Sequence, residues 1–276
     1  MTIKDLLINL ATGINDDATI DYAISLARTF DAHLAGVAFA YDTVPPAMLA
    51  GEVPPAWIAE FRKEAQDAAQ AAVKKFEATV ERAGISSQAG WLSAGMAGPA
   101  ELFGRMARRF DLSVVRQADP GKITPAPEFI EAALFQAGRP VLVVPYIQKG
   151  GVGLERVIVC WDGSRSAARA AGDAMPFLER AKTVEVAMVT AHGKSDETPG
   201  ADIARHLARH GIAVEVKQIV APDAKTADVL LSHAADTSAD LLVMGGYGHS
   251  RLREFVLGGV TRSILDTMTV PTLMSH

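Results

Sequence analysis

The chain has 276 residues, enough for about two compact domains, and its 49% hydrophobic and 21% charged residues are typical of a globular protein. The formal net charge is −5, the wrong sign for a protein dedicated to binding nucleic acid. The single cysteine, Cys160, excludes an intramolecular disulfide and a cysteine-rich metal module. No apolar run is long enough to span a bilayer, and the N-terminus lacks a signal-peptide pattern. We therefore expect a cytoplasmic protein with no nucleic-acid or membrane partner.

The N-terminal half begins with an apolar strand predicted over Lys4–Leu10. Tyr41–Trp57 contains two Pro-Pro pairs and is predicted to be a loop. Proline has no backbone N–H to donate to a neighbouring β-strand, and it does not fit inside a helix. The alanine-rich amphipathic stretch Trp57–Phe76 is predicted to be a helix that covers a sheet. Lys149–Gly153 contains three glycines and is predicted to be a flexible hinge between two halves.

The C-terminal half alternates short apolar runs with longer amphipathic ones, which is typical of βαβ units and a parallel sheet. Near-continuous apolar strands indicate a sheet that is covered on both faces. The predicted strands are Arg156–Trp161, Val184–Thr190, Ile212–Ile219, Leu241–Met244 and Thr272–Met274, and the predicted helices are Ser164–Arg180, Pro199–His210, Ala224–Asp236 and Arg253–Thr267.

Three segments recur in the two halves, in the same order and at nearly one spacing. Residues 110–115 resemble residues 239–244, 81–85 resemble 208–212, and 139–144 resemble 270–275. The recurrence predicts that the chain contains two copies of one fold unit in tandem, as an α/β protein with domains at residues 1–148 and 154–276.

A glycine-rich segment follows the strand Leu241–Met244. It reads Gly245-Gly246-Tyr247-Gly248-His249-Ser250-Arg251 and, after a short stretch, Gly258-Gly259-Val260-Thr261. In open α/β sheets, ligands bind at the carboxyl ends of strands, and glycine-rich turns before helices favour phosphate. A tight strand-to-helix turn with no ligand explains the glycines equally simply.

The spacing Gly245-x2-Gly248-x9-Gly258 resembles the ATP-binding motif of the universal stress protein family. The resemblance implies, in each domain, a doubly wound five-stranded parallel sheet flanked by helices. It also implies that Asp162 contacts the nucleoside, that Val189 lines the adenine slot, and that the glycines lie on the ribose-phosphate side. The implied ligand is ATP, or ADP or AMP, with Mg²⁺ as a counter-ion. The expected binding residues are Asp162, Val189, Met244, Gly245, Gly248, His249, Gly258, Gly259, Val260 and Thr261.

This sequence departs from the family pattern at Gly259, where a serine or threonine is usual. The departure removes a hydroxyl donor and predicts weakened binding, with Thr261 offering a nearby hydroxyl. In the N-terminal half, Arg116-Gln117 replaces the double glycine, and Ala11 occupies the place of Asp162. We therefore expect no nucleotide site of the same kind there, and a solvated Arg116.

Other candidate motifs have simpler explanations. Gly193-Lys194-Ser195 lacks the first glycine of a P-loop, and Ser164 is best explained as a helix N-cap. His206 and His210 have a metal-chelating spacing but no evident third ligand. Cys160 lies in an apolar strand, where a buried inert thiol is expected.

These observations favour a nucleotide-binding stress sensor or regulator that hydrolyses ATP slowly at most, because no residue resembles a general base beside the phosphates. Two alternatives stay open. One is a nucleotide-free protein-interaction scaffold of the same fold. The other is an ATP-dependent synthetase or ligase, although its usual loops are absent from the sequence.

Assembly is predicted from the last strand of each half. In the family, domains often pair through the final strand, so Val141–Val144 and Thr272–Met274 are expected to pair within one chain as an internal pseudo-dimer. A homodimer of two chains is a further possibility that the sequence leaves open.

Overall fold

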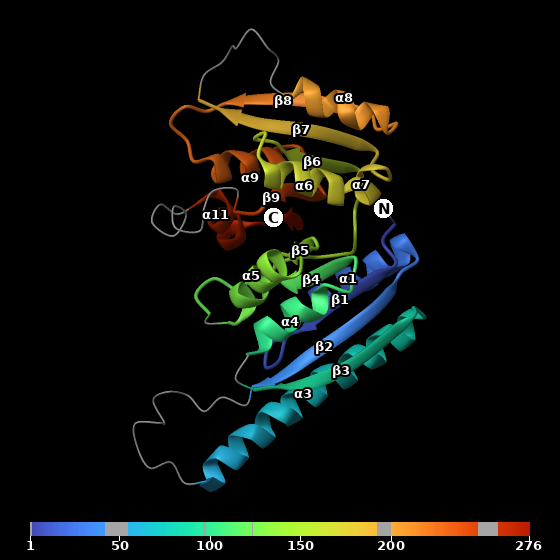
Figure 1. Ribbon diagram of the computed structural model, residues 1–276, viewed down its shortest axis with the longest axis vertical. Helices are drawn as coiled ribbons and strands as arrows, with labels where there is room; N and C mark the ends of the chain where they lie inside the picture. The colour runs from blue at the N-terminus through green and yellow to red at the C-terminus, as the bar shows by residue number, and fades with distance from the viewer. Residues whose placement is uncertain (1, 42–54, 96–97, 123, 192–199, 248–258) are drawn as a thin grey trace.

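The computed structural model describes residues 2–41, 55–95, 98–122, 124–191, 200–247 and 259–276. Its strands form one sheet in the order β3-β2-β1-β4-β5-β10-β9-β6-β7-β8 (Figure 1), which confirms the predicted α/β class. The strands are β1 Asp5–Leu10, β2 His33–Tyr41, β3 Ser87–Ala94, β4 Leu112–Arg116, β5 Val141–Val144, β6 Arg156–Cys160, β7 Thr183–Thr190, β8 Val214–Val220, β9 Leu241–Gly245 and β10 Thr272–Ser275.

Helices cover both faces of the sheet, as near-continuous apolar strands require. One face packs against α1, α3, α6, α7 and α8, and the other against α4, α5, α9 and α11. The helices are α1 Asp17–Phe30, α3 Pro55–Ala83, α4 Pro99–Ala107, α5 Ala126–Gln136, α6 Arg165–Asp173, α7 Met175–Leu178, α8 Ala201–Arg209, α9 Thr226–Asp236 and α11 Val260–Thr267.

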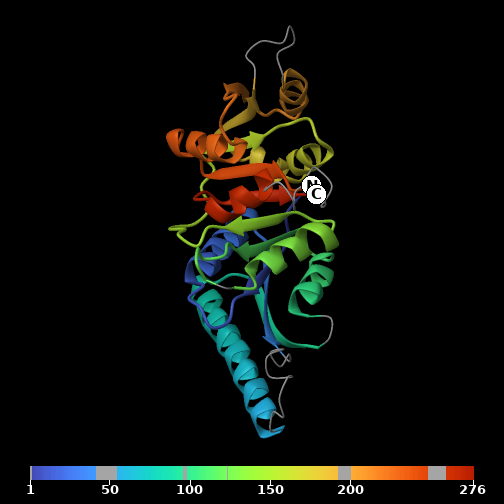
Figure 2. The same cartoon turned by 90° about the vertical axis from the view of Figure 1, so that its left-hand side faces the viewer.

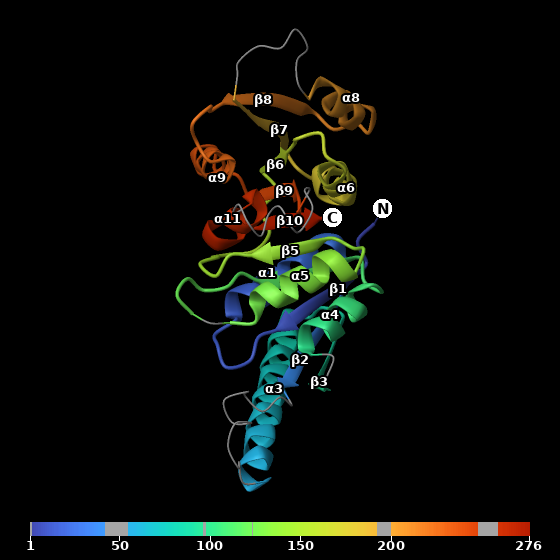
Figure 3. The same ribbon diagram turned by 60° about the vertical axis from the view of Figure 1, so that its left-hand side comes forward.

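The two halves meet at the centre of the sheet, where β5 and β10 lie side by side (Figure 3). They pair antiparallel, with Leu142 opposite Leu273, while the other strand pairs of the sheet are parallel. Both leucines are fully buried. The predicted pairing of the final strands within one chain is confirmed, and it covers two strand edges that would otherwise be exposed.

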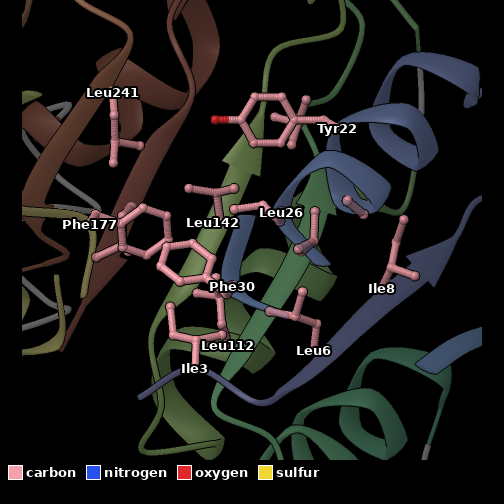
Figure 4. Packing of buried hydrophobic residues seen from close by; sticks show 14 of the residues in the cluster. Ile3, Leu6, Ile8, Tyr22, Leu26, Phe30, Leu112, Leu142, Phe177 and Leu241 are labelled. Carbon is pink, nitrogen blue, oxygen red and sulfur yellow. The ribbon is translucent and has the colours of Figure 1, made fainter. Parts of the chain in front are cut away.

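Two helices on the same face of the sheet, α1 and α7, also connect the two halves. The ring of Phe30, at the end of α1, packs edge-on against Phe177 of α7 with centroids 4.8 Å apart (Figure 4). The guanidinium of Arg180 lies 4.8 Å from the centre of the Phe30 ring. The aromatic contact and the cation over the ring each stabilise this junction by about 1 kcal/mol beyond the contribution of the buried area.

Two predictions are wrong in detail. The single helix expected over Ser164–Arg180 is broken into α6 and α7 at Ala174, shortly before Pro176, which lacks the N–H that an unbroken helix would need. The glycine-rich linker is also not an open hinge. A Cβ on Gly153 would lie 2.5 Å from Asp240 Oδ1, and the N–H of Val152 donates to Ser25 Oγ at 2.9 Å. Close packing rather than flexibility therefore explains Gly153.

The helix α3 is longer than the predicted Trp57–Phe76. Its second half covers the sheet as expected, with Val73 and Phe76 buried. Its first turns project beyond the body of the molecule (Figure 2), and Trp57 and Phe61 are 58% and 41% exposed. Across the described ranges, no helix combines the length and apolarity that crossing a membrane requires.

Candidate functional site

The start of α6 lies at the carboxyl end of β6. Asp162 follows that strand, and its Oδ1 accepts the N–H of Ser164 at 2.9 Å. Ser164 Oγ accepts the N–H of Ala167 at 3.1 Å and lies 3.1 Å from Ser166 Oγ. The prediction that Ser164 caps this helix is therefore confirmed. The Asp162 side chain is exposed, so it is accessible at the strand edge where a ligand was expected.

Gly245 brings the end of β9 against the same helix. A Cβ at this position would lie 2.5 Å from Ser166 Oγ and 2.6 Å from the backbone nitrogen of Ala167. A glycine is therefore required here by the approach of α6, whether or not a ligand binds. The contact sets the first turn of α6 beside the glycine-rich segment.

Thr261 ties the beginning of that segment to α11. Its Oγ1 accepts the N–H of Tyr247 at 3.0 Å, and the threonine is 3% exposed. Tyr247 has a φ of +51°, a conformation that is costly for a residue with a large side chain. The Thr261 hydroxyl, which could replace the one missing at position 259, thus already accepts one hydrogen bond.

Gly259 begins α11 and has no side chain with which to cap it. Among the described residues, no side chain caps the first turn of this helix. The N–H groups of an uncapped first turn, together with the helix dipole, favour an anion. Val260, the next residue, is 38% exposed.

Two further expected residues differ in how accessible they are. Met244 is 5% exposed and its side chain belongs to the core beneath α9 and α11, so that only its backbone faces the strand edge. Val189 is half-buried near the end of β7. Gly248, His249 and Gly258 lie outside the described residues, as does Gly193-Lys194-Ser195.

In the N-terminal half, the equivalent strand edge is occupied by charged side chains. Arg116 is 9% exposed, and it pairs with Asp119 and lies 3.7 Å from Asp16. The expectation of a solvated Arg116 is therefore wrong. Burial raises the pKa of Asp16 to about 6 even though its Oδ2 accepts the N–H of Ala11 at 3.2 Å.

The remaining motifs show ordinary structural roles. The rings of His206 and His210 lie 5.0 Å apart, and within the described part of the chain no three His, Cys, Asp or Glu side chains gather as a metal site. Cys160 is buried, and burial raises the pKa of its thiol to about 12.

Sequence reasoning missed a buried polar cluster beneath α9. Glu185 of β7 is 5% exposed, its Oε1 contacts His233 Nε2, and its Oε2 accepts from Arg156 at 3.5 Å. The signal was visible in the sequence, because an acidic residue stands between Val184 and Val186 in an otherwise apolar run.

The C-terminal half of the chain is similar in sequence to a known protein family. Residues 153–276 match the sequence model of the universal stress protein family. A universal stress protein from Synechocystis sp. is 28% identical over 152 residues, which cover 52% of this chain and 49% of the relative. The chain therefore spans about half the length of that curated relative.

Two solved structures share the whole architecture. A universal stress protein from Archaeoglobus fulgidus DSM 4304 superposes with a TM-score of 0.70 at 16% identity, covering 98% of this chain and 95% of that one. A functionally unknown protein from Pseudomonas aeruginosa PAO1 has a TM-score of 0.63 at 12% identity, covering 99% and 92%. At these identities the likeness shows the fold alone. The match over residues 153–276, slightly less than half of the chain, shows that this part of the sequence is similar to the universal stress protein family.

Proposed function

We propose that the C-terminal half binds an adenine nucleotide, ATP or its ADP or AMP products, at the carboxyl ends of β6 and β9. We further propose that the chain acts as a stress-response sensor or regulator with little or no turnover. The observation that carries the proposal is the start of α11 at Gly259, where no side chain of the described residues caps the first turn. An uncapped first turn offers N–H donors and a positive dipole end to a phosphate group.

The surrounding contacts support the same position for the ligand. Thr261 holds Tyr247 beside this helix, and Gly245 holds the start of α6 against the end of β9. Two helix N-termini are thereby brought to one strand edge. The exposed carboxylate of Asp162 suits a nucleoside hydroxyl, and the half-buried Val189 suits the face of a base.

The proposed lack of turnover follows from how the polar groups at this edge are engaged. One oxygen of Asp162 accepts the Ser164 N–H and the other is assigned to the nucleoside hydroxyl in this proposal, while the hydroxyls of Ser164 and Ser166 lie within hydrogen-bond distance of each other. A general base needs a free acceptor beside the attacking water. Mg²⁺ would accompany the phosphates as a counter-ion, with its remaining ligands supplied by water.

The first test is to denature freshly purified full-length protein and to identify any released nucleotide by mass spectrometry, followed by an ATP titration. About one nucleotide per chain supports the proposal. An empty protein that also ignores millimolar ATP overturns it and favours a nucleotide-free scaffold. About two nucleotides per chain would contradict the assignment to the C-terminal half alone.

The second test compares two threonines of α11. Thr261→Val removes the hydroxyl that holds Tyr247, whereas Thr267→Val removes a hydroxyl that donates to Ser263 O at the other end of the helix. We expect Thr261→Val to weaken ATP binding about tenfold, as the loss of a hydrogen bond near the phosphates implies. Thr267→Val should bind as the wild type does. Equal affinities in both variants would remove Thr261 from the site.

A further inference from the structure

The N-terminal half contains a cavity of about 120 Å³ at its own carboxyl strand edge, where β1, β2 and β4 end and α5 begins. Strand register relates it to the C-terminal site. Phe39 occupies the position of Val189, and counting back from β5 and β10 places Phe129 at the position of Val260. The two phenylalanine rings lie 5.6 Å apart. Two larger side chains thus occupy the space that valines leave open in the other half, and the cavity is too small for a nucleotide.

The size of the cavity indicates what it can hold. A protein cavity of roughly 150 Å³ lined by apolar side chains admits one benzene molecule. A volume of about 120 Å³ lined by Phe39, Tyr41 and Phe129 therefore suits one six-membered ring with few substituents.

Two polar groups in its lining have no partner. Asn9 of β1 is 7% exposed, and its carboxamide has no hydrogen bond to any residue in the described ranges. The hydroxyl of Thr124 is likewise buried without a partner. A buried hydroxyl left without hydrogen bonds costs stability, and such groups are rare in folded proteins. The polar atoms of Asn9 are not fully enclosed and are accessible from the cavity. The Asn9 side chain faces the cavity, so a bound molecule can supply the missing partners.

The charge of the lining argues against an anionic ligand. Arg116 also borders the cavity, but its guanidinium is already paired with Asp119 and lies beside Asp16. Asp119 also pairs with Lys122 at 2.7 Å, so two carboxylates balance two cations and leave no net positive charge for an anion. The ligand that fits is therefore neutral.

We propose that this cavity binds a neutral single-ring compound with a carboxamide or lactam edge. The ring packs against Phe39 and Phe129, and the edge pairs with the carboxamide of Asn9, which both donates and accepts. The site is separate from the nucleotide site proposed for the C-terminal half and does not depend on it.

The test uses the full-length protein and three probes of nearly one shape, namely benzamide, benzoate and toluene, with dissociation constants from ligand-observed NMR titrations. We expect benzamide to bind about tenfold more tightly than either other probe, because only benzamide satisfies Asn9 without bringing a charge. Equal binding of toluene, equal or tighter binding of benzoate, or no binding of any probe at millimolar concentration overturns the proposal.

Variants locate the binding. Asn9→Leu keeps the volume but removes the polar group, so benzamide should weaken about tenfold while toluene is retained. The matched control is Ser113→Ala, which removes a buried unpartnered hydroxyl on β4 that does not line the cavity. This control should leave benzamide binding unchanged, and a loss equal to that of Asn9→Leu overturns the proposal.

Ala126→Leu fills the cavity from the start of α5 and should abolish binding of benzamide and toluene, even if Asn9→Leu fails to fold. A final measurement separates the two halves of the chain. Saturating ATP should not change the affinity for benzamide. Competition between them would place the probe in the C-terminal site and overturn the assignment.

Discussion

Gln117 reaches from the N-terminal half into the C-terminal half, where its Nε2 donates to the carbonyl oxygen of Leu265 at 2.9 Å. Its Oε1 accepts the N–H of Tyr146 at 3.2 Å, and the residue is fully buried. Gly246 is its counterpart in the C-terminal half. The Gln117 N–H donates to Val144 O at the end of β5, and the Gly246 N–H donates to Ser275 O at the end of β10, each at 2.8 Å. The N-terminal half therefore has a glutamine where the other half has a glycine, and this glutamine adds a hydrogen bond between the halves.

Gln117→Ala should lower the free energy of unfolding by about 2 kcal/mol, because it removes the partners of two part-buried backbone groups and creates a small void. Urea denaturation followed by circular dichroism measures this change. Gln148→Ala is the control, because Gln148 is partly exposed and donates only to the carbonyl of the adjacent Lys149. If both variants lose the same stability, the contact with Leu265 contributes nothing.

The sequence predicted the sheet because its strands carry strong apolar runs, and the family resemblance implied the β5–β10 pairing because domains of that family often pair through the final strand. It did not predict the role of Gln117, whose partner lies 148 positions away in the chain. Arg116 was misjudged partly for the same reason, since Asp16 is distant in the sequence. Its other partner, Asp119, lies only three residues away and was a local signal that the prediction overlooked. The break before Pro176 was visible in the sequence but was outweighed by the helical periodicity on both sides.

At the candidate site, the sequence predicted the helix cap correctly but did not predict the packing role of Gly245. The Ser164 cap follows from a serine before a helical stretch. Gly245, by contrast, was expected on the ribose-phosphate side, whereas its Cα faces the start of α6. A glycine in a motif can serve backbone packing and ligand access alike, and spacing alone does not separate these roles.

Substitutions at two adjacent glycines test experimentally which of them is required for backbone packing. Gly245→Ala would place a Cβ 2.6 Å from the Ala167 backbone nitrogen, whereas Gly246→Ala would meet the flexible end of Leu134 at 3.1 Å. We expect Gly245→Ala to destabilise the protein by about 2 kcal/mol and Gly246→Ala by less than about 1 kcal/mol. Thermal denaturation tests the order, and its reversal would show that α6 yields more readily than Leu134.

Asp16 should make stability depend on pH in the direction opposite to most carboxylates. Its folded-state pKa of about 6 exceeds its ordinary value of 3.8, because burial disfavours the charged form. The folded state therefore holds the proton more tightly than the unfolded chain. The contribution of this group is most favourable below about pH 4 and is lost as the pH rises to about 6, by at most about 3 kcal/mol.

Urea unfolding of the wild type and of Asp16→Asn between pH 4 and 7 measures this contribution. The wild type should lose stability relative to the variant as the pH rises, whatever constant difference the altered contact with Arg116 adds. Asp21→Asn, at an exposed position of α1, should track the wild type. A difference between wild type and Asp16→Asn that stays flat, or grows in favour of the wild type, would contradict the raised pKa.

Cys160 should be chemically silent in the folded protein. It is buried in β6, and burial, with smaller effects from Asp162 and Glu185, raises the pKa of its thiol to about 12, so almost no thiolate exists at neutral pH. Because it is the single cysteine, reaction with Ellman's reagent at pH 8 reports on this site alone. We expect labelling to be at least about a hundredfold slower in buffer than in denaturing urea, as inaccessible and protonated thiols require. Cys160→Ala combined with Ala168→Cys moves the thiol to an exposed position of α6 and should react promptly under both conditions. Fast labelling of the folded wild type would show instead that β6 opens readily beside the proposed nucleotide site.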